Sequence, residues 1–241
     1  MLHKTRGIVL HSTNYNDSYS IVRIFTEEFG ITSYFVSKSK GKKSKGIQSF
    51  LHPLAILDME VEHYNLRDIH KIKEVKNILP LNSIFCNPIK SSVCLFLSEF
   101  LSKVIKEIQA DKLLFNYIIQ SLEILDLTEK GYSNFHLVFM IRISQFLGFY
   151  PDASEYRKGS FFDMLNGNFA TYKPNHPNFL NPDESEVFAL LLRMSYDNMH
   201  SFQLSRNQRH DIINRVLEYY SLHLISFSEI KSLDILHEVF D

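Results

Sequence analysis

The chain lacks several features that mark common classes of protein. Its 241 residues include no tryptophan and only two cysteines, Cys86 and Cys94. Both cysteines lie in or beside an apolar segment, which argues against a disulfide framework and predicts buried, reduced thiols. No apolar run approaches the ~18 residues of a membrane span, and residues 1–6 contain no hydrophobic signal core. We therefore expect a soluble, cytoplasmic protein.

Motifs of catalysis and of metal binding are also missing. The sequence contains no G-x-S-x-G, no P-loop and no G-x-G-x-x-G. Its eleven histidines form neither H-E-x-x-H nor a close ligand pair, and the two cysteines lack zinc-ligand spacing. Glu27/Glu28 and Asp183/Glu184 fall at a turn and a helix start, where solvation and the helix dipole explain them. The sequence predicts a binding protein, not an enzyme, with no cofactor and no metal.

One basic segment stands out in a chain of net charge −1. Residues 36–46 hold five lysines, two glycines and no acidic residue. A loop of this composition can be a solvated surface loop or a docking site for a polyanion. Residues 1–80 carry 12 Lys+Arg against 8 Asp+Glu, whereas the remainder carries 14 against 19. This asymmetry suggests that the two parts of the chain contact different partners.

Residues 1–80 have the pattern of a small β domain. Runs rich in β-branched and aromatic residues, or alternating in hydropathy, predict strands over 5–11, 18–26, 31–36 and 57–62. A further strand is expected over 67–76, but Ile69, Ile72 and Val75 lie three apart, so either a bulge or a helical turn fits there. Five short strands predict a small barrel or sandwich, and the OB-fold is a five-stranded barrel of this kind.

After residue 80 the periodicity becomes helical. The expected helices begin at Asn87-Pro88 and then cover roughly 112–127, 134–147, 182 onward, 206–224 and 231–240. The helix over 134–147 is apolar on most sides and should be the buried centre of a bundle. The segment 149–181 is irregular, and a connection of that length is usually functional or an ordered insertion. We expect two domains, residues 1–80 and 81–241.

Nucleic-acid binding is the function that these patterns favour. Basic residues before and within the strands, together with the lysine loop, could line one face of a barrel. The candidate DNA-binding residues are Lys4, Arg6, Arg23, Lys38, Lys40, Lys42, Lys43 and Lys45. The interleaved aromatics Tyr15, Tyr19, Tyr34 and Phe35 could stack on unpaired bases, although core or surface packing is the more common role for any one of them.

The first 54 residues also contain a recognisable series of motifs. They are Thr5-Arg-Gly-Ile-Val-Leu10, Tyr15-Asn-Asp-Ser-Tyr19, Ile24-Phe-Thr26, Gly30, Lys38-Ser-Lys40-Gly41 and Leu51-His-Pro53-Leu54. In order and spacing they resemble the amino-terminal signature of the RecO family of bacterial recombination-repair mediators. The segments 147–151 and 162–167 match the helical half of that family in layout.

The resemblance implies an α+β multidomain protein, with an N-terminal OB-fold barrel followed by an all-α domain. It implies binding to single- and double-stranded DNA, annealing of complementary strands and association with the nucleoid during repair. The implied partners are RecR, the acidic carboxy-terminal tail of single-strand-binding protein and, indirectly, RecA. The tail would need an apolar pocket with a basic rim, for which the helical domain offers Arg142, Arg193, Arg206, Arg209 and Arg215.

Two departures from the family pattern matter. Many relatives have an acidic residue where Tyr19 stands. Many also carry four zinc-binding cysteines in the stretch that corresponds to 149–181, and this chain has none there. We infer a zinc-finger-like insertion without metal ligands, stabilised by its aromatics Phe161, Phe162, Phe169 and Tyr172.

Two other interpretations remain open at this point. The barrel could dock a protein partner, with the lysines serving only solubility. It could also bind RNA, because stacking and backbone charge discriminate poorly between the two nucleic acids.

Overall fold

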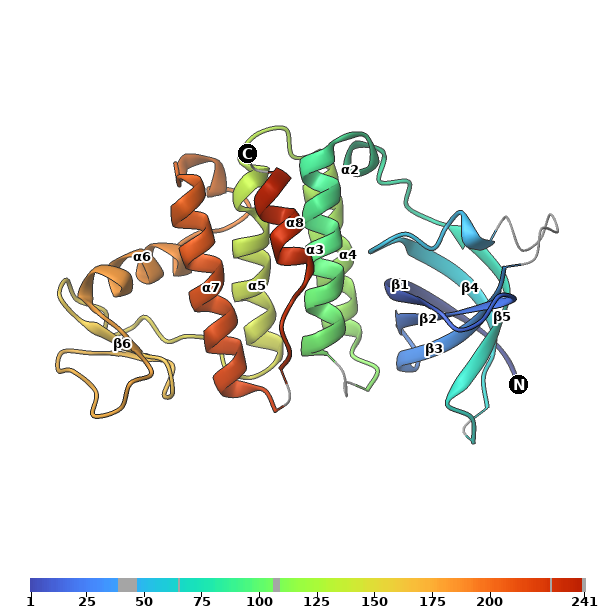
Figure 1. Cartoon of the computed structure of the whole chain (residues 1–241), viewed down its shortest axis with the longest axis horizontal. Helices are drawn as coiled ribbons and strands as arrows, with labels where there is room; N and C mark the ends of the chain where they lie inside the picture. The colour runs from blue at the N-terminus through green and yellow to red at the C-terminus, as the bar shows by residue number, and fades with distance from the viewer. Residues whose placement is uncertain (39–46, 65, 106–108, 226, 240–241) are drawn as a thin grey trace. The chain divides into compact units, whose positions relative to one another are not determined.

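The computed structural model describes residues 1–38, 47–64, 66–105, 109–225 and 227–239 (Figure 1). The chain forms two compact units. The first comprises Met1–Asp126 with Ile230–Leu236, and the second comprises Leu127–Glu229 with His237–Asp241. The first unit therefore includes helices as well as the amino-terminal strands.

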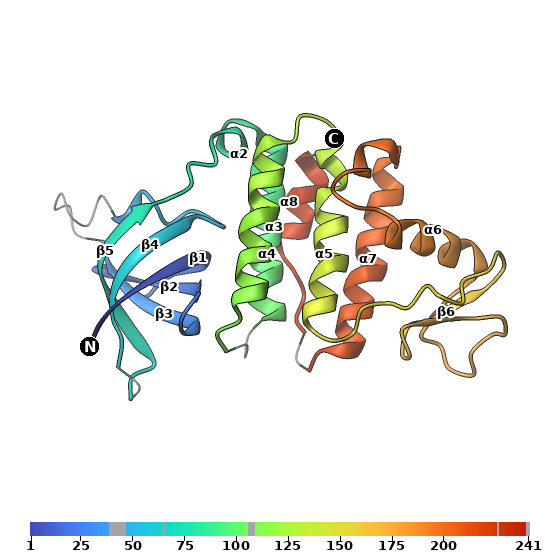
Figure 2. The same cartoon turned by 180° about the vertical axis from the view of Figure 1, so that it is seen from behind.

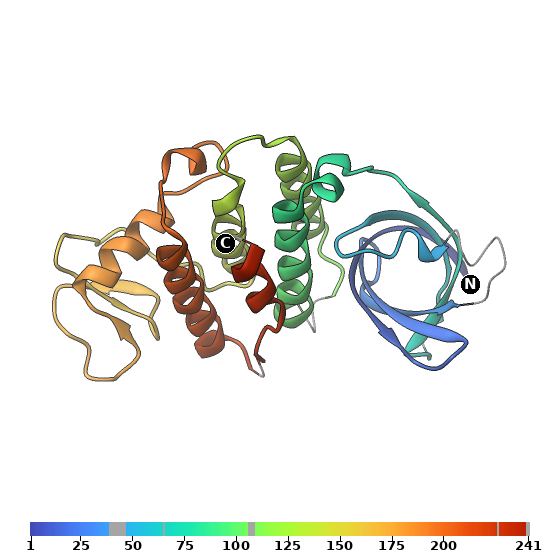
Figure 3. The ribbon, with the colours of Figure 1, turned by 45° about the horizontal axis from the view of Figure 1, so that its top comes forward.

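Five strands of the first unit close into a barrel, seen with its strands curving into a ring in Figure 3. They are β1 (Leu2–Asn14), β2 (Tyr19–Thr26), β3 (Gly30–Ser37), β4 (Ile56–Glu62) and β5 (Ile69–Asn77). Their order around the barrel is β1-β2-β3-β5-β4, and β4 returns to pair with β1. Only β3 and β5 pair in parallel. The predicted five-stranded OB-fold barrel is confirmed.

The interior of the barrel is filled by alternate side chains of its strands. Its buried apolar members are Val9, Val22, Ile24, Tyr34, Val36, Ala55, Leu57, Met59 and Val61. Gly7 faces the same interior, and a Cβ atom there would lie 2.5 Å from Met59 Cε and 2.6 Å from Ile24 Cγ2. The narrow core leaves room only for glycine at this position.

The uncertain fifth strand contains a bulge. Met59 is opposite Val75, and Val61 is opposite Ile72, so Lys73 is the extra residue between the two pairs. Ile72 and Val75 can therefore both pack against the barrel core, although they are three residues apart. The bulge, and not the helical turn, explains the spacing in the sequence.

Three helices complete the main part of this unit: α2 (Asn82–Cys86), α3 (Pro88–Val104) and α4 (Lys112–Leu127). Asn87 caps α3, because its Oδ1 accepts hydrogen bonds from the backbone N–H groups of Ile89 and Lys90. The expected helix start and the bounds of the 112–127 helix are confirmed, whereas the short α2 was not anticipated.

Hydrogen bonds and a ring contact join these helices to one another and to the barrel. The buried Lys90 donates through Nζ to Ser83 Oγ at 2.7 Å and to the carbonyl of Asp126 at 2.9 Å. The ring of Phe25, on the outer side of β2, lies 5.7 Å from that of Phe115 in α4. One side of the barrel is therefore covered by helix.

The two cysteines differ in exposure. Cys94 in α3 is buried, and burial raises the pKa of its thiol to about 12. Cys86 at the end of α2 is exposed, so the prediction of two buried thiols is wrong for this residue.

The second unit is built on α5 (Phe135–Phe146), α6 (Pro182–Leu192) and α7 (Arg206–His223). Helix α5 is buried along nearly its whole length and packs against α6 and α7. Figure 2 shows α5 beside α7 from behind. Capping boxes at Asn181/Glu184 and Ser205/Gln208 begin α6 and α7. The last helix, α8 (Ser232–Val239), runs from the first unit into the second.

The segment 149–181 is ordered around a three-stranded sheet. Its strands β6 (Phe161–Asp163), β7 (Asn168–Ala170) and β8 (Phe179–Leu180) lie in the order β7-β6-β8. Phe162 is fully buried, and its ring lies 4.5 Å from Phe188 and 4.9 Å from Phe169. Burial of such a ring contributes about 1.5–3 kcal/mol. Tyr172 was expected to belong to this aromatic core, but it is 73% exposed and lies outside it.

Asp163 holds the turn after β6 and a neighbouring loop. Its carboxylate accepts hydrogen bonds from the backbone N–H groups of Leu165 and Asn166, and its Oδ2 lies 3.2 Å from His176 Nε2. Burial opposes ionisation of this carboxyl, but the hydrogen bonds outweigh burial and lower its pKa. Polar side chains and aromatic packing thus connect the loops of this insertion.

Candidate nucleic-acid interface

The outer face of β2, β3 and β5 collects side chains suited to binding a nucleic-acid strand. Val22 and Tyr34 point into the barrel, so their neighbours Ile21, Arg23 and Phe35 point outward. In the strand register, Phe35 is opposite Ile21 on one side and Lys71 on the other. This face, which we call the β2-β3-β5 face, is therefore aromatic at its centre and basic at its edge.

Three aromatic rings cluster on the β2-β3-β5 face. The ring of Phe35 lies 5.5 Å from Tyr15 and 6.1 Å from Tyr19, in edge-to-face geometry. Tyr15 is 61% exposed and Tyr19 is 44% exposed, so both present ring surface to solvent. Tyr34 is fully buried in the barrel, so it packs in the core, unlike the neighbouring Phe35. Exposed rings of this kind are stacking surfaces for unpaired bases.

A shallow hollow of about 280 Å³ lies beside these rings. It is lined by Tyr19, Phe35, Val36, Ser37, Ile47, Lys71, Ile72 and Lys73. Lys73 forms an ion pair with Glu62, with 2.9 Å between Nζ and Oε1. Lys71 is exposed and lies opposite Glu62 of β4 in the strand register. The Lys73 hydrogen bond is the main cause that lowers the pKa of Glu62, and the charge of Lys71 adds to it. Lys71 forms no ion pair with any residue that the structure describes, so its ammonium remains accessible to a phosphate.

The lysine loop is attached to the hollow at both ends. Ser37 and Ile47 line the hollow, and Gln48 Nε2 donates to the carbonyl of Ser37 at 3.0 Å. Lys38 lies at the same end of the barrel, where its Nζ donates to the carbonyl of Asn16 at 2.7 Å. The other predicted lysines, Lys40, Lys42, Lys43 and Lys45, lie outside the described residues.

Arg23 lies on the same outer face, opposite His11 in β1 and Ser33 in β3. It is half-buried, and burial lowers the pKa of its guanidinium. Arginine remains charged at neutral pH after such a shift, because its ordinary pKa exceeds about 12. Arg23 therefore supplies positive charge between the aromatic cluster and the helix-covered side of the barrel.

Lys4 and Arg6 lie on another part of the barrel. They point outward from β1 opposite Glu60 and Asp58 of β4. Arg6 also forms two 2.8 Å hydrogen bonds with Glu27. Because of this hydrogen-bonded pair, the pKa of Arg6 is raised and that of Glu27 is lowered. The structure does not bring Lys4 and Arg6 together with the β2-β3-β5 face.

Arg6 is also engaged with helix α4. Its guanidinium lies 5.3 Å from the centre of the Phe115 ring, and its Nη2 donates to Asn116 Oδ1 at 3.2 Å. These contacts join the barrel to the helix, which is a structural role for this arginine.

Lys71 was missed at the sequence level. The ambiguous apolar spacing of 67–76 concealed which residues face outward, and only the register with β3 places Lys71 beside Phe35. The alternation of apolar and acidic residues that predicted the strand ending at Glu62 does not recur in β5. It therefore could not show which residues of β5 face outward.

The arginines of the second unit are engaged in contacts of their own. Arg142 lies over Tyr150, Arg193 lies over Tyr156, Arg209 donates to the carbonyl of Leu204, and Arg215 pairs with Glu184 and Glu218. Arg206 is exposed in the first turn of α7. The structure does not gather these five residues around one apolar pocket.

The described residues offer neither a metal-binding cluster nor a membrane-spanning helix. No group of three or more His, Cys, Asp or Glu side chains in this part of the chain is placed to hold a metal ion. No helix among the same residues is long and apolar enough to cross a membrane.

A closed barrel of this strand order, joined to helices and bearing exposed aromatics and lysines, defines a multidomain OB-fold protein. Two family models match the chain: "Recombination protein O N terminal" over residues 1–80 and "Recombination protein O C terminal" over residues 87–233. The chain belongs to the RecO family of DNA repair proteins, as its motifs indicated.

Similar proteins match over their full length. The chain is 57% identical to the DNA repair protein RecO of Azobacteroides pseudotrichonymphae over 241 residues, which are 100% of both chains. It is 42% identical to that of Phocaeicola vulgatus and 41% identical to that of Bacteroides fragilis, again over 100% of each chain.

Proposed function

We propose that this RecO-family protein binds single- and double-stranded DNA and anneals complementary strands. The observation that carries the proposal is the β2-β3-β5 face, where the rings of Tyr19 and Phe35 lie beside Lys71 and between the ends of the lysine loop. Residues 1–80 act as the DNA-binding domain, and residues 81–241 act as the helical domain.

Binding on this face combines two physical terms. The lysines of the loop, Lys38 among them, neutralise backbone phosphates together with Lys71 and Arg23. Tyr19 and Phe35 stack on unpaired bases, and stacking tolerates any sequence because every base has a π face. Annealing then requires no covalent chemistry, since charge neutralisation lowers strand–strand repulsion and weak contacts let bases exchange partners.

The partners in this proposal follow from family membership. The protein acts with RecR, contacts the acidic tail of single-strand-binding protein and so helps to load RecA onto coated single strands. Family membership supports these partners, and the described residues suggest no particular surface for them.

The proposal is tested by reversing charge in the lysine loop. Lys40→Glu/Lys42→Glu/Lys43→Glu should nearly abolish binding of single-stranded DNA at moderate salt, because each removed contact also becomes a repulsion. Lys71→Glu should weaken binding at least several-fold, whereas Lys158→Glu, an exposed lysine of the second unit, should not. Fluorescence anisotropy of labelled oligonucleotides measures all three.

The same titration separates the other interpretations. Equal affinity for RNA and DNA would favour an RNA-binding protein, and binding to neither would favour a protein adaptor. Unchanged affinity of the triple variant would refute the role of the loop. Circular dichroism confirms that each variant remains folded.

A further inference from the structure

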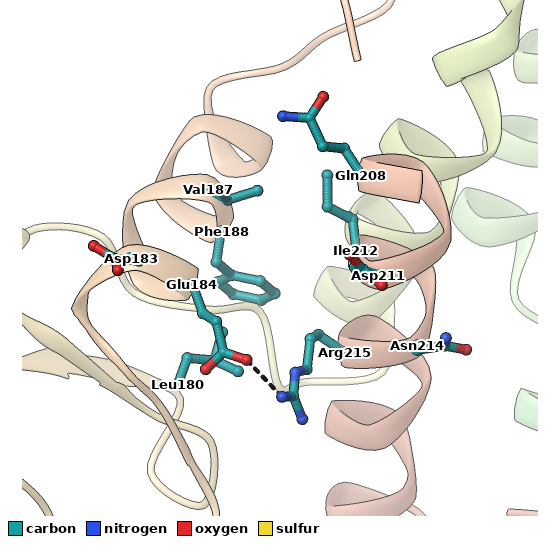
Figure 4. A pocket seen from close by; sticks show the side chains of 10 residues that line it. All are labelled: Leu180, Asp183, Glu184, Val187, Phe188, Gln208, Asp211, Ile212, Asn214 and Arg215. Atoms are coloured by element: carbon teal, nitrogen blue, oxygen red, sulfur yellow. Dashed lines mark hydrogen bonds and ion pairs between the residues drawn. The ribbon is translucent and has the colours of Figure 1, made fainter. Parts of the chain in front are cut away.

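A groove between α6 and α7 in the second unit is a candidate binding site distinct from the β2-β3-β5 face (Figure 4). Its volume is about 580 Å³. Phe188 and Val187 of α6, Ile212 of α7 and Leu180 of β8 provide its apolar surface. Such a volume can hold one or two large apolar side chains of a ligand.

The rim of the groove is acidic. Asp183 and Glu184 lie in the first turn of α6, and Asp211 lies on α7. Glu184 is held in place, because its Oε2 accepts a hydrogen bond from the backbone N–H of Asn181 and its Oε1 lies 2.5 Å from Arg215 Nη2. Figure 4 shows these two side chains meeting across the groove.

The positive charge of Arg215, which lines the groove, is neutralised by neighbouring carboxylates. Arg215 pairs with Glu184 and, through Nη1 at 2.8 Å, with Glu218. The hydrogen bonds with these two carboxylates raise the pKa of the guanidinium. Asp183 and Asp211 are both exposed, and neither forms an ion pair with another residue of the described part of the chain. Two carboxylates without an ion-pair partner among the described residues therefore flank an apolar floor.

We propose that this groove binds a segment of a partner protein that presents an apolar side chain flanked by lysine or arginine. The apolar side chain would pack against Val187 and Phe188, and the flanking cations would lie against Asp183 and Asp211. The same carboxylates repel a phosphate backbone and an acidic peptide, so the groove does not fit either of those ligands.

The test uses the full-length protein and a random peptide display library. Peptides enriched on the wild type should share an apolar residue with basic neighbours. Synthetic peptides made from the enriched sequences should bind with an affinity that falls as salt rises.

Substitutions in and beside the groove test whether the selected peptides bind there. Asp183→Asn/Asp211→Asn should weaken a selected peptide about three- to fivefold for each charge removed. Val187→Lys should abolish binding, because it places a like charge in the groove. Glu186→Gln, an exposed carboxylate of α6 outside the groove, is the matched control and should bind normally.

The outcomes are distinct. Enrichment of acidic peptides, no enrichment that depends on Val187, or equal binding by the double aspartate variant would overturn the proposal. Sedimentation that shows self-association lost in Val187→Lys would assign the groove to a second copy of this chain instead. Affinity for single-stranded DNA should stay unchanged in every variant, so failure here is separate from failure of the nucleic-acid proposal.

Discussion

At the scale of single residues, the role of an aromatic side chain depends on which side of the barrel it faces. Tyr34 and Phe35 are neighbours in β3, yet Tyr34 is fully buried while Phe35 borders the hollow beside Lys71. Tyr34 carries a polar hydroxyl and is nevertheless the buried residue, so side-chain hydrophobicity does not separate the two. The pleat of the strand does, because successive side chains point to opposite faces.

Phe35→Ala tests the stacking role. Loss of one base–aromatic contact, worth about 1–3 kcal/mol, should weaken single-stranded DNA binding by about five- to 150-fold. Tyr172→Ala removes an exposed ring from the second unit and should have no effect. Equal affinities for the two variants in an anisotropy titration would argue against stacking on the barrel.

A glycine in the insertion permits a second residue-scale prediction. Gly167 has φ +68°, and a Cβ there would lie 2.6 Å from Tyr219 Oη, which donates to the carbonyl of Phe149. Gly167→Ala should destabilise the protein by about 1–3 kcal/mol from backbone strain, plus the cost of displacing that hydroxyl. Urea unfolding measures the loss.

Gly159→Ala is the control for this clash. Gly159 has φ +88° but no atom within 4 Å of its added Cβ, so this variant reports strain alone. If both variants lose the same stability, Tyr219 contributes nothing to the requirement for glycine at position 167.

At the scale of elements, capping motifs located helix starts well. Asn87, Asn181 and Ser205 cap helices that begin at the positions the sequence predicted, residues 88, 182 and 206. These motifs involve residues within one turn of each other, so local sequence is sufficient to identify them. The first strand was less well predicted, because Leu2–Asn14 extends beyond its hydrophobic centre by backbone pairing with β2 and β4.

The beginning of α8 depends on a residue far away in the sequence. Glu99 of α3 accepts hydrogen bonds from the backbone N–H and the hydroxyl of Ser232, and it pairs with Lys103 at 2.9 Å. Burial alone would raise the pKa of this carboxyl, but these hydrogen bonds outweigh burial and lower it to about 2.

Glu99→Gln should therefore loosen the start of α8, with a loss of about 1 kcal/mol in the free energy of local opening. Because the folded pKa lies below the ordinary value of 4.5, ionised Glu99 stabilises the fold above about pH 4.5. That contribution falls as pH drops toward 2. The difference between wild type and variant in hydrogen exchange of α8 should shrink over this range, and a constant difference would contradict the assignment.

At the scale of the whole molecule, basic and acidic side chains are concentrated in different parts of the chain, and neither sign is in large excess. The net charge is −1, yet five lysines are concentrated in residues 36–46 of the sequence, while Asp183 and Asp211, which form no ion pair among the described residues, flank a groove of the second unit. The proposed function therefore requires a polyanion to be attracted through a local patch and not through the total charge.

The number of phosphate contacts on that patch is measurable. If about four contacts form with a single strand, the logarithm of the binding constant should fall against the logarithm of salt concentration with a slope of roughly −3. Lys71→Glu should make the slope less negative by about 0.7, since one contact is lost. A slope near zero in the wild type would show that binding is not electrostatic.

The amino-acid sequence was sufficient to predict the OB-fold barrel, the helical half, the helix starts and the family. These depend on hydropathy period and on motifs whose residues lie close together in the chain. Which charges share a face, in contrast, depends on the tertiary structure. It separated Arg6, paired with Glu27, from the β2-β3-β5 face, and it brought Lys71 to Phe35. The physical reason is that strand register, a bulge and helix packing set these neighbours, and all three arise from pairing between segments distant in sequence.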